Sequence, residues 1–433
     1  MAEVTSYDPQ MARKAAMASV FGTLIEWYDF FLYGTAAALI FPKVFFPESD
    51  AYAGTLQSFA VFAVGFCARP IGGMIFGHFG DRMGRKKALM ITMFLMGISS
   101  FLMGCIPSYN SIGLWAPLLL VCLRVIQGIA VGGEWGGAIL LSMEWGKKNK
   151  QGLMSSLPSA GIGLGLLLSS AIVSLMMSIS GAGFYSWGWR VCFFLSLLLV
   201  VVGVLMRWTI EETPSFREAQ KSQKVARAPL IEVLRKHPRA VICSALIKMP
   251  EHVSTQIYMT AMISIAMRYY NLDKQYLVNA VMAASVLMCF NIVLSGFISD
   301  KIGIRRMYMI GVVLTLLWAF PYVSIIDTGI PFAFVVATIL AQFPHQTMAG
   351  CQGALVAQSF PVNLRYSGAS MGVQIAAVFS GGIAPLVSTY LMHTFGTIYA
   401  IGSYIVAVSV VGIIGTALIP VHNEGSVTEN QVT

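Results

Sequence analysis

The sequence predicts an all-α polytopic membrane protein in which twelve transmembrane helices form two pseudo-symmetric six-helix bundles. Composition is the first reason, because 57% of the 433 residues are hydrophobic and only 11% are charged. Soluble domains carry about 25% charged residues, so a chain this poor in charge cannot coat a surface that faces water. The second reason is a row of long apolar segments. The third is a basic loop that occurs twice, about half a chain length apart.

The apolar segments are each long enough to cross a bilayer, which takes about 20 helical residues. Several are longer than that, which indicates tilted helices or ends that project beyond the lipid. Read in order, they predict transmembrane helices at 15–41, 53–78, 88–107, 113–143, 152–179, 189–208, 239–267, 275–298, 306–326, 331–359, 367–393 and 397–420.

Loop charge sets the orientation of these helices. Basic residues gather on the side of both termini, for example at 82–87 and 147–150. The opposite loops hold only Lys43, Arg268 and Lys274. Positive charge is retained on the cytoplasmic side of a membrane, so an even number of spans places both termini in the cytoplasm.

The two basic loops share the pattern Gly-x-x-x-Asp-[Arg/Lys]-x-Gly-x-[Arg/Lys]-[Arg/Lys]. The first copy, at 77–87, follows the second span, and the other, at 296–306, follows the eighth. A polar segment rich in charged residues separates the first six spans from the last six. We therefore expect an N-terminal bundle at 1–208, a cytoplasmic linker at 209–238, a C-terminal bundle at 239–421 and a cytoplasmic tail at 422–433.

Other classes of protein are disfavoured by the same sequence. The net charge of +9 lies in short loops and forms no basic face, so nucleic acid is not an expected partner. The seven cysteines lie in apolar segments without a C-x-x-C pair, which favours free thiols over disulfides or a metal site. The first apolar run continues as a full span, so we expect no cleavable signal peptide. Without a recognisable P-loop or nucleophile–base arrangement, we expect no cofactor, no metal and no enzymatic activity.

Short motifs carry a family resemblance. They are Glu-Trp-Tyr-Asp-Phe at 26–30, Ala-Arg-Pro-Ile-Gly-Gly at 68–73, Arg-Val-Ile-Gln-Gly at 124–128, Gly-Gly-Glu-Trp-Gly-Gly at 132–137, Trp-Gly-Trp-Arg at 187–190, Glu-Thr-Pro-Ser-Phe at 212–216 and Arg-Tyr-Ser-Gly at 365–368. With the twelve spans, the linker and the repeated loop, they resemble the metabolite:proton symporter family of the major facilitator superfamily. The resemblance covers nearly the whole chain, and shikimate-type and related organic-acid carriers look most similar.

The resemblance implies a secondary active transporter of the bacterial inner membrane that works by alternating access, as a functional monomer. The proton would be its coupling ion, and its cargo a small organic anion such as shikimate or a di- or tricarboxylate. Antiporters of the superfamily carry a Gly-Pro-x-x-Gly-Gly type motif in span 5, and residues 157–165 do not match it, which favours symport.

Two alternatives stay open. One is a proton-coupled carrier of proline or betaine, against which Lys248 and the short C-terminal tail weigh slightly. The other is a polytopic enzyme or receptor, for which the outer loops are too short to supply an extramembrane module.

Ionisable side chains within the spans are the candidates for function, because a charge at membrane depth costs at least about 2.5–3.5 kcal/mol. Asp29 and Arg124 are the preferred proton-coupling pair, since the resemblance places spans 1 and 4 face to face. A substrate carboxylate that shares Arg124 would release Asp29 to take up a proton. The alternative is a permanent salt bridge between the two spans. Glu26 and Glu134 are further proton-coupling candidates, although Glu134 equally fits a role in holding Arg69.

Substrate-binding candidates gather on span 7, where Lys248, Glu251 and His252 occupy one turn beside a proline. Such interrupted helices near the midplane often build transporter sites. Lys248 would hold an anion, unless it forms a purely structural i, i+3 pair with Glu251. The remaining candidates, which either complete a polar pocket or merely pack, are Arg69, Tyr28, Gln127, Gln256, His345 and Gln346.

The repeated loops are the predicted gate. The resemblance implies that Asp81 engages the opposite bundle near span 11, with Arg82 and Arg85 in support. The second copy is expected to gate more weakly, because it has Ser and Ile where the first has Gly and Arg. The gating candidates are Gly77, Asp81, Arg82, Arg85, Asp300 and Arg305.

Overall fold

The computed structural model describes residues 9–83, 85–132, 134, 138–140, 142–143, 150–208, 229–361 and 364–420. Side chains are described for these residues except 9–13, 15, 77–83, 85–89, 206–208, 229–231 and 366. Most of the predicted linker, the predicted tail and the side chains of the gating candidates Gly77, Asp81, Arg82 and Arg85 therefore lie outside the described residues. The predicted domain boundaries stay predictions.

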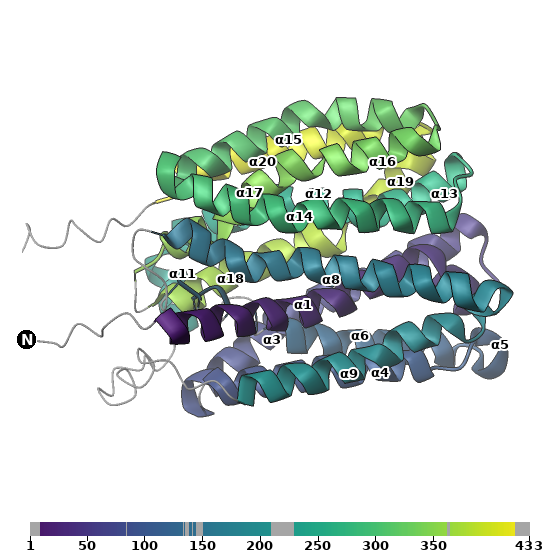
Figure 1. Ribbon diagram of the computed structural model, residues 1–433, viewed down its shortest axis with the longest axis horizontal. Coiled ribbons are helices and arrows are strands. Elements are labelled where there is room, and N and C mark those ends of the chain that lie inside the picture. The colour runs from purple at the N-terminus through teal and green to yellow at the C-terminus, as the bar shows by residue number, and fades with distance from the viewer. Residues whose placement is uncertain are drawn as a thin grey trace, which may run out of the picture.

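The described part of the chain is helical, and its long helices pack side by side along the longest dimension of the molecule (Figure 1). The first half contributes α1 (Pro9–Leu39), α3 (Ala51–Met83), α4 (Arg85–Cys105), α6 (Trp115–Gly132), α8 (Gln151–Ser180) and α9 (Gly188–Trp208). Three short elements, α2 (Phe41–Val44), α5 (Tyr109–Ile112) and η1 (Gly181–Tyr185), lie in their connections.

The second half begins with the short α11 (Pro229–Lys236), whose Val233 is buried among the C-terminal helices. Its spans are α12 (Pro238–Gln256) with η2 (Ile257–Ala261) and α13 (Met262–Tyr269); α14 (Lys274–Ile302); α15 (Ile304–Asp327); α16 (Pro331–Leu340) with α17 (Gln342–Ala357); α18 (Arg365–Ala377) with η4 (Val378–Gly382) and α19 (Ala384–Phe395); and α20 (Tyr399–Leu418). In Figure 1, α8 and α14 lie next to each other where the two halves meet.

Eight helical segments in the described residues are long and apolar enough to cross a membrane by length and composition alone. The other four spans are α1, α4, the α12–η2–α13 segment and α16–α17. Three of these four carry buried ionisable side chains such as Asp29, Glu251 and His345, which make them less apolar. The prediction of twelve spans is confirmed. The sequence analysis expected an interruption in the span of α12, beside Pro250, but not the breaks in the spans of α16 and α18.

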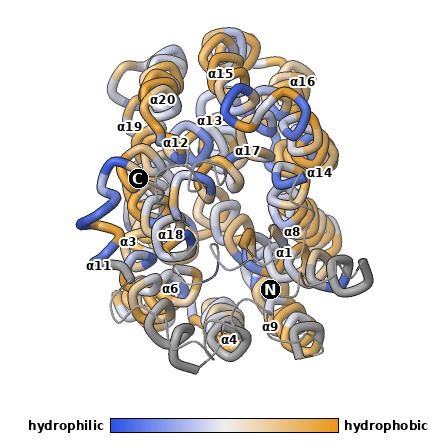
Figure 2. Tube along the Cα trace, turned by 90° about the vertical axis from the view of Figure 1, so that its left-hand side faces the viewer, coloured by the Kyte–Doolittle hydropathy of each residue, from blue (hydrophilic) through white to orange (hydrophobic). Residues whose placement is uncertain are grey.

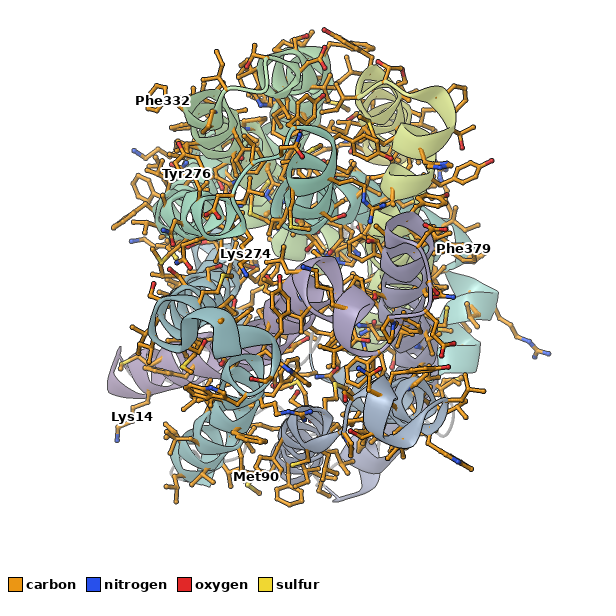
Figure 3. All side chains as sticks on the ribbon, turned by 90° about the vertical axis from the view of Figure 1, so that its right-hand side faces the viewer. Lys14, Met90, Lys274, Tyr276, Phe332 and Phe379 are labelled. Atoms are coloured by element: carbon orange, nitrogen blue, oxygen red, sulfur yellow. The ribbon has the colours of Figure 1, made fainter. Side chains whose placement is uncertain are left out.

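The outside of the molecule is apolar, as a surface in lipid must be. Phe332 and Phe379 are 71% and 62% exposed, and Figure 3 shows both at the rim of the molecule. In Figure 2 the helices are coloured mostly as hydrophobic, and strongly hydrophilic stretches occur chiefly where helices join. The arrangement fits a multi-pass membrane protein.

Glycines let α3 and α6 pack backbone to backbone. A methyl group added at Gly72 would overlap the carbonyl oxygen of Ile129, and one added at Gly128 would overlap that of Gly65. Gly132 lies equally close to the carbonyl oxygen of Arg69. Small residues of this kind allow close approach of transmembrane helices.

The two halves meet at one end of the molecule through the second copy of the repeated loop. The carboxylate of Asp300 accepts hydrogen bonds from the backbone N–H groups of Gly152 at 2.7 Å and Leu153 at 3.0 Å. These are free donors in the first turn of α8, where a negative charge is also favoured by the helix dipole. Gln358 donates to Gln151 across the same boundary at 2.8 Å.

The halves also meet at the opposite end. The Arg268 guanidinium donates to the Ala51 carbonyl oxygen and, at 2.7 Å, to the Thr55 hydroxyl. The rings of Tyr52 and His393 stack with their centroids 3.8 Å apart. Contacts between the bundles are thus present at both ends of the structure.

We predict that Gly72→Ala lowers the thermal stability of the detergent-solubilised protein, because the added methyl group has no space beside Ile129. Overpacking of a close contact costs about 1–3 kcal/mol. Gly54→Ala, in the same helix, is the matched control, since the nearest atom to its added methyl group would be 3.5 Å away. Equal melting temperatures for the two variants would contradict the close packing of α3 and α6.

Candidate functional site

Buried polar side chains form two clusters, one in each half of the molecule. We call Asp29, Ser100, Arg124, Gln127 and Ser196 the N-cluster, and Lys248, Glu251, His252, His345 and Gln346 the C-cluster. All of these side chains are buried. Buried polar groups in membrane helices face the protein interior because lipid offers them no partner.

Asp29 on α1 is held by hydroxyl groups. Its Oδ1 accepts a hydrogen bond from Ser196 on α9, and Ser100 on α4 lies beside the same carboxylate. Its Oδ2 has no hydrogen-bond partner. One oxygen of this carboxylate therefore accepts a hydrogen bond, and the other oxygen accepts none.

Arg124 on α6 lies against aromatic rings, 4.1 Å above the ring of Tyr33 and 4.9 Å above that of Phe62. Its guanidinium donates to Gln127, whose amide in turn donates to Ser100 at 2.7 Å. Asp29 and Arg124 thus share one cluster, but among the described contacts they form no direct ion pair. In this conformation Gln127 and Ser100 lie between the two charges, so both the coupling role of the pair and the alternative of a salt bridge between spans 1 and 4 stay predictions.

Arg69 and Glu26 lie at the edge of the N-cluster. They line a small cavity of about 10 Å³ together with Arg124 and Gln127, close to the volume that one water molecule needs. The Arg69 guanidinium also lies 4.2 Å from the centre of the Phe66 ring. The cavity brings together four residues that the sequence analysis assigned to two roles, proton coupling for Glu26 and Arg124 and substrate binding for Arg69 and Gln127.

Glu134 is buried after the end of α6, and most of its neighbours in the chain lie outside the described residues. Tyr28 donates its hydroxyl proton to the Cys192 carbonyl oxygen at 2.7 Å. That bond joins α1 to α9 within the first bundle and occupies the hydroxyl group that a substrate would use.

The C-cluster is built around a direct ion pair. The Lys248 ammonium contacts the Glu251 carboxylate and donates to Gln352 on α17 at 2.7 Å. His252 and His345 approach the same carboxylate, each with its Nε2 atom 3.9 Å from one of the oxygens. The i, i+3 spacing of Lys248 and Glu251 therefore gives the contact that the helix geometry implies.

His345 is held by bonds at both ring nitrogens. Its Nε2 lies 2.7 Å from the Thr255 hydroxyl and 3.2 Å from the Glu251 carbonyl oxygen. Its Nδ1 lies 2.7 Å from the Gln346 amide nitrogen. The imidazole thereby ties α17 to α12.

The helices that carry the C-cluster are interrupted. Pro250 lies inside α12 and cannot donate a backbone hydrogen bond, and the π-helix η2 follows directly. The span of α17 breaks at Ala341, and the π-helix η4 brings the Ser380 hydroxyl to 3.4 Å from His252 Nδ1. Interrupted helices at this depth are a common basis of transporter binding sites.

Several buried polar atoms have no hydrogen-bond partner within the described part of the chain. They include atoms of Trp27, Tyr33, Arg124, Gln256, Tyr258 and Gln346. Most buried polar groups in proteins are paired, so a group of unpaired ones indicates bound water or a ligand. Gln256 and Gln346 are the sequence-predicted binding residues in this set.

Sequence reasoning missed the neutral members of the site. Ser100 and Ser196 beside Asp29, and Thr255, Gln352 and Ser380 in or near the C-cluster, were not among the candidates. Serine and threonine are common in transmembrane helices, so neither their type nor their spacing marks them. Among the described residues, no group of three or more His, Cys, Asp or Glu side chains is arranged to hold a metal ion.

Of the gating candidates whose side chains are described, Asp300 contacts the opposite half and Arg305 does not. Arg305 donates to the carbonyl oxygen of Thr416 at 2.9 Å, at the end of α20 in its own half. A weaker role for the second loop stays a prediction, because the side chains of the first loop lie outside the described residues.

Comparison with known proteins identifies the fold. The sequence matches the Major Facilitator Superfamily over residues 19–365 and again over 244–432. A D-xylose–proton symporter of known structure superposes with a TM-score of 0.71, covering 94% of this chain and 98% of that one. At 17% identity, this similarity bears on the fold alone.

Curated relatives are closer in sequence. A shikimate transporter of Escherichia coli (strain K12) is 41% identical over 92% of both chains. An inner membrane metabolite transport protein of the same strain is 35% identical over 96% of both. A proline/betaine transporter of that strain is 31% identical over 95% of this chain and 84% of the relative. The chain belongs to the Major Facilitator Superfamily, a family of transporters rather than enzymes, as its motifs and its twelve helices predicted.

Proposed function

We propose that the protein is a proton-coupled symporter that imports a small organic acid, such as shikimate or a di- or tricarboxylate, by alternating access. The observation that carries this proposal is the buried Lys248 ammonium on an interrupted helix, beside acids and unpaired polar groups. A buried cation of this kind is costly unless it is paired. A carboxylate substrate is a natural alternative partner for it.

Neutral polar groups elsewhere in the second bundle suit a hydroxylated acid. Gln256, Tyr258 and Gln346 each have a polar atom without a hydrogen-bond partner. Neutral groups of this kind bind hydroxyl and carbonyl oxygens without adding charge. The 41% identical shikimate transporter supports such a cargo.

The N-cluster supplies a proton-binding site under this proposal. Asp29 is buried, and its Oδ2 has no hydrogen-bond partner. Arg124 acts on it through Gln127 and Ser100 rather than by contact. A substrate anion or a movement of α6 that draws Arg124 away would favour proton uptake by Asp29.

The contacts between the bundles suit alternating access. Asp300 binds the first turn of α8 at the cytoplasmic end, and Arg268 binds the first turn of α3 at the other. Opening either side requires one of these contacts to break. We infer that both termini are cytoplasmic, that the membrane is a bacterial inner membrane, and that the monomer is the functional unit.

A zwitterion such as proline or betaine is the second candidate cargo. The 31% identical proline/betaine transporter favours it, and the adjacent Lys248 and Glu251 offer one charge of each sign. A polytopic enzyme or receptor has no comparable support.

Uptake into proteoliposomes tests the proposed function. We expect an imposed pH gradient, acid outside, to drive accumulation of at least one organic acid from a labelled panel, and a protonophore to abolish it. Empty liposomes are the control. Uptake that is the same with and without the pH gradient would contradict proton coupling. Uptake of betaine without any acid would establish the second candidate.

We predict that Asp29→Asn lowers the equilibrium accumulation ratio about tenfold at a gradient of one pH unit. The reason is thermodynamic: with the membrane potential held at zero, one pH unit is worth 1.36 kcal/mol per co-transported proton, which is about tenfold. Counterflow exchange without a gradient should persist. Asp327→Asn is the control, since its carboxylate binds the exposed Tyr270 hydroxyl at 2.8 Å. An unchanged ratio would exclude Asp29 from coupling.

Asp300→Asn should reduce the turnover rate more than the apparent affinity for substrate. The amide cannot accept from both N–H groups of α8, and it removes a negative charge that is worth about 0.3–1 kcal/mol there. The matched control is Asp273→Asn, because Asp273 caps α14 through Tyr276 within one helix. A change confined to affinity would place Asp300 in binding rather than gating.

A further inference from the structure

The two halves of the transporter hold their buried acids differently. Asp29 and Arg124 are separated by neutral side chains, whereas Glu251 is in direct contact with Lys248. The side chains of this second pair are only 3% and 4% exposed. Competition between a substrate carboxylate and a resident carboxylate for one cation requires such direct contact. The geometry therefore fits that exchange in the C-cluster better than in the N-cluster.

We propose that Glu251 is a second proton carrier, which takes up a proton when the substrate carboxylate replaces it on Lys248. The inference rests on the proposed proton-coupled uptake and adds a residue to its coupling machinery. In the structure the Glu251 carboxylate is the ion-pair partner of the Lys248 ammonium, so a substrate carboxylate that binds Lys248 must take its place.

The exchange balances in charge and in protons. On the outer side the substrate carboxylate pairs with Lys248, and Glu251, now without its counter-charge, binds a proton from the outer solution. On the inner side the substrate leaves, Lys248 pairs with Glu251 again, and the proton is released to the cytoplasm. No bond other than that to the transported proton is made or broken, and Lys248 stays an ammonium throughout.

The titratable and charged groups around Glu251 come from its own helix, from α17 and α15, and from the first bundle. Lys248 and His252 share its helix, His345 faces it from α17, and the Tyr308 phenol from α15 lies close enough to interact with its charge. Arg69 of the first bundle lies near His252 on the far side. The other groups that compete for the proton are therefore the two imidazoles.

Hydrogen bonding keeps the proton off Nδ1 of His345. The Thr338 carbonyl oxygen only accepts, so the Gln342 amide nitrogen donates to it at 3.0 Å. The Gln342 oxygen then accepts from the Gln346 amide nitrogen at 3.3 Å, and that same nitrogen lies 2.7 Å from His345 Nδ1. An amide nitrogen cannot accept, so Nδ1 is the acceptor and His345 is neutral with its hydrogen on Nε2.

The second imidazole has weaker support for a positive charge. His252 Nδ1 lies 3.4 Å from the Ser380 hydroxyl, and its Nε2 lies 3.9 Å from the carboxylate that Lys248 already neutralises. Lys248 and Arg69 both lie close to it and oppose a further positive charge. Glu251 is left as the group in the C-cluster that can gain a proton when the ion pair opens.

The first test is the accumulation ratio of purified full-length protein in proteoliposomes. The probe is the acid that the wild type accumulates, at pH values where that acid is fully ionised on both sides. We expect Glu251→Gln to lower the ratio about tenfold at one pH unit of gradient, since one coupled proton is lost. A ratio equal to that of the wild type would overturn the proposal, even if the KM rises, because an equilibrium ratio does not depend on affinity.

The matched control is Glu232→Gln. Glu232 pairs with Lys236 at 2.6 Å on α11, away from the C-cluster. The substitution therefore removes a carboxylate–ammonium pair of the same kind without touching the site. If the wild-type accumulation ratio does not respond to the pH gradient, the proposed function itself is contradicted. A normal wild-type ratio together with an unchanged Glu251→Gln ratio is a failure of this inference alone.

A second variant covers the case in which Glu251→Gln does not fold. Gln346→Glu gives His345 Nδ1 a carboxylate to donate to, which favours the imidazolium. That positive charge, 3.9 Å from Glu251 in the present geometry, opposes protonation of the carboxylate. We expect the outer pH for half-maximal uptake to shift toward lower values. A pH profile that superimposes on that of the wild type would overturn the role of Glu251.

Discussion

Lipid offers no partner for a charge or a hydrogen-bonding group, and the rest of this structure depends on that constraint. The polar side chains that a transporter needs must be satisfied by other side chains inside each bundle. Lys248 shows the outcome, because its ammonium contacts one carboxylate and one amide oxygen within the second bundle. Arg124 is satisfied differently, by aromatic faces and a glutamine.

The interruptions in the helices follow from the same constraint. A regular helix satisfies all its backbone groups internally, so it leaves only side chains for the site. Pro250 and the π-helix η2 disturb that pattern in the span of Glu251, and η4 disturbs it opposite His252. A span with interrupted backbone hydrogen bonding depends more on packing against its neighbours than a regular helix does. Close packing in the second bundle supports one of these spans, because a methyl group added at Gly412 of α20 would overlap the Pro250 ring.

The sequence predicted the parts of this arrangement that helical periodicity controls. Apolar length located the spans, and the i, i+3 spacing brought Lys248 and Glu251 together. Distances between different helices follow no such rule, so the separation of Asp29 from Arg124 by Gln127 and Ser100 could not be derived. The breaks at η2 and η4 were missed for a related reason. A π-helix inserts one residue into a turn without any residue type that marks it in the sequence.

Under the proposed alternating access the two bundles move apart, although both contain buried polar side chains. The placement of their charges explains how this is possible. Among the described contacts, the direct pair of Lys248 and Glu251 lies within one bundle, and the N-cluster lies within the other. The described bonds between the bundles join two neutral groups or one charged side chain and a neutral partner, as with Gln374 on the Gly132 carbonyl oxygen at 2.9 Å and Asp300 on the backbone of α8. Water can replace such bonds with little net loss, since a typical hydrogen bond contributes about 0.5–1.5 kcal/mol. An ion pair buried across the boundary would instead leave two unpaired charges on opening, at about 3–5 kcal/mol. Under the proposed alternating access, holding the Lys248–Glu251 pair within one half keeps the barrier to the conformational change low. The proposed exchange of partners on Lys248 would then change the protonation of the site without joining the two halves.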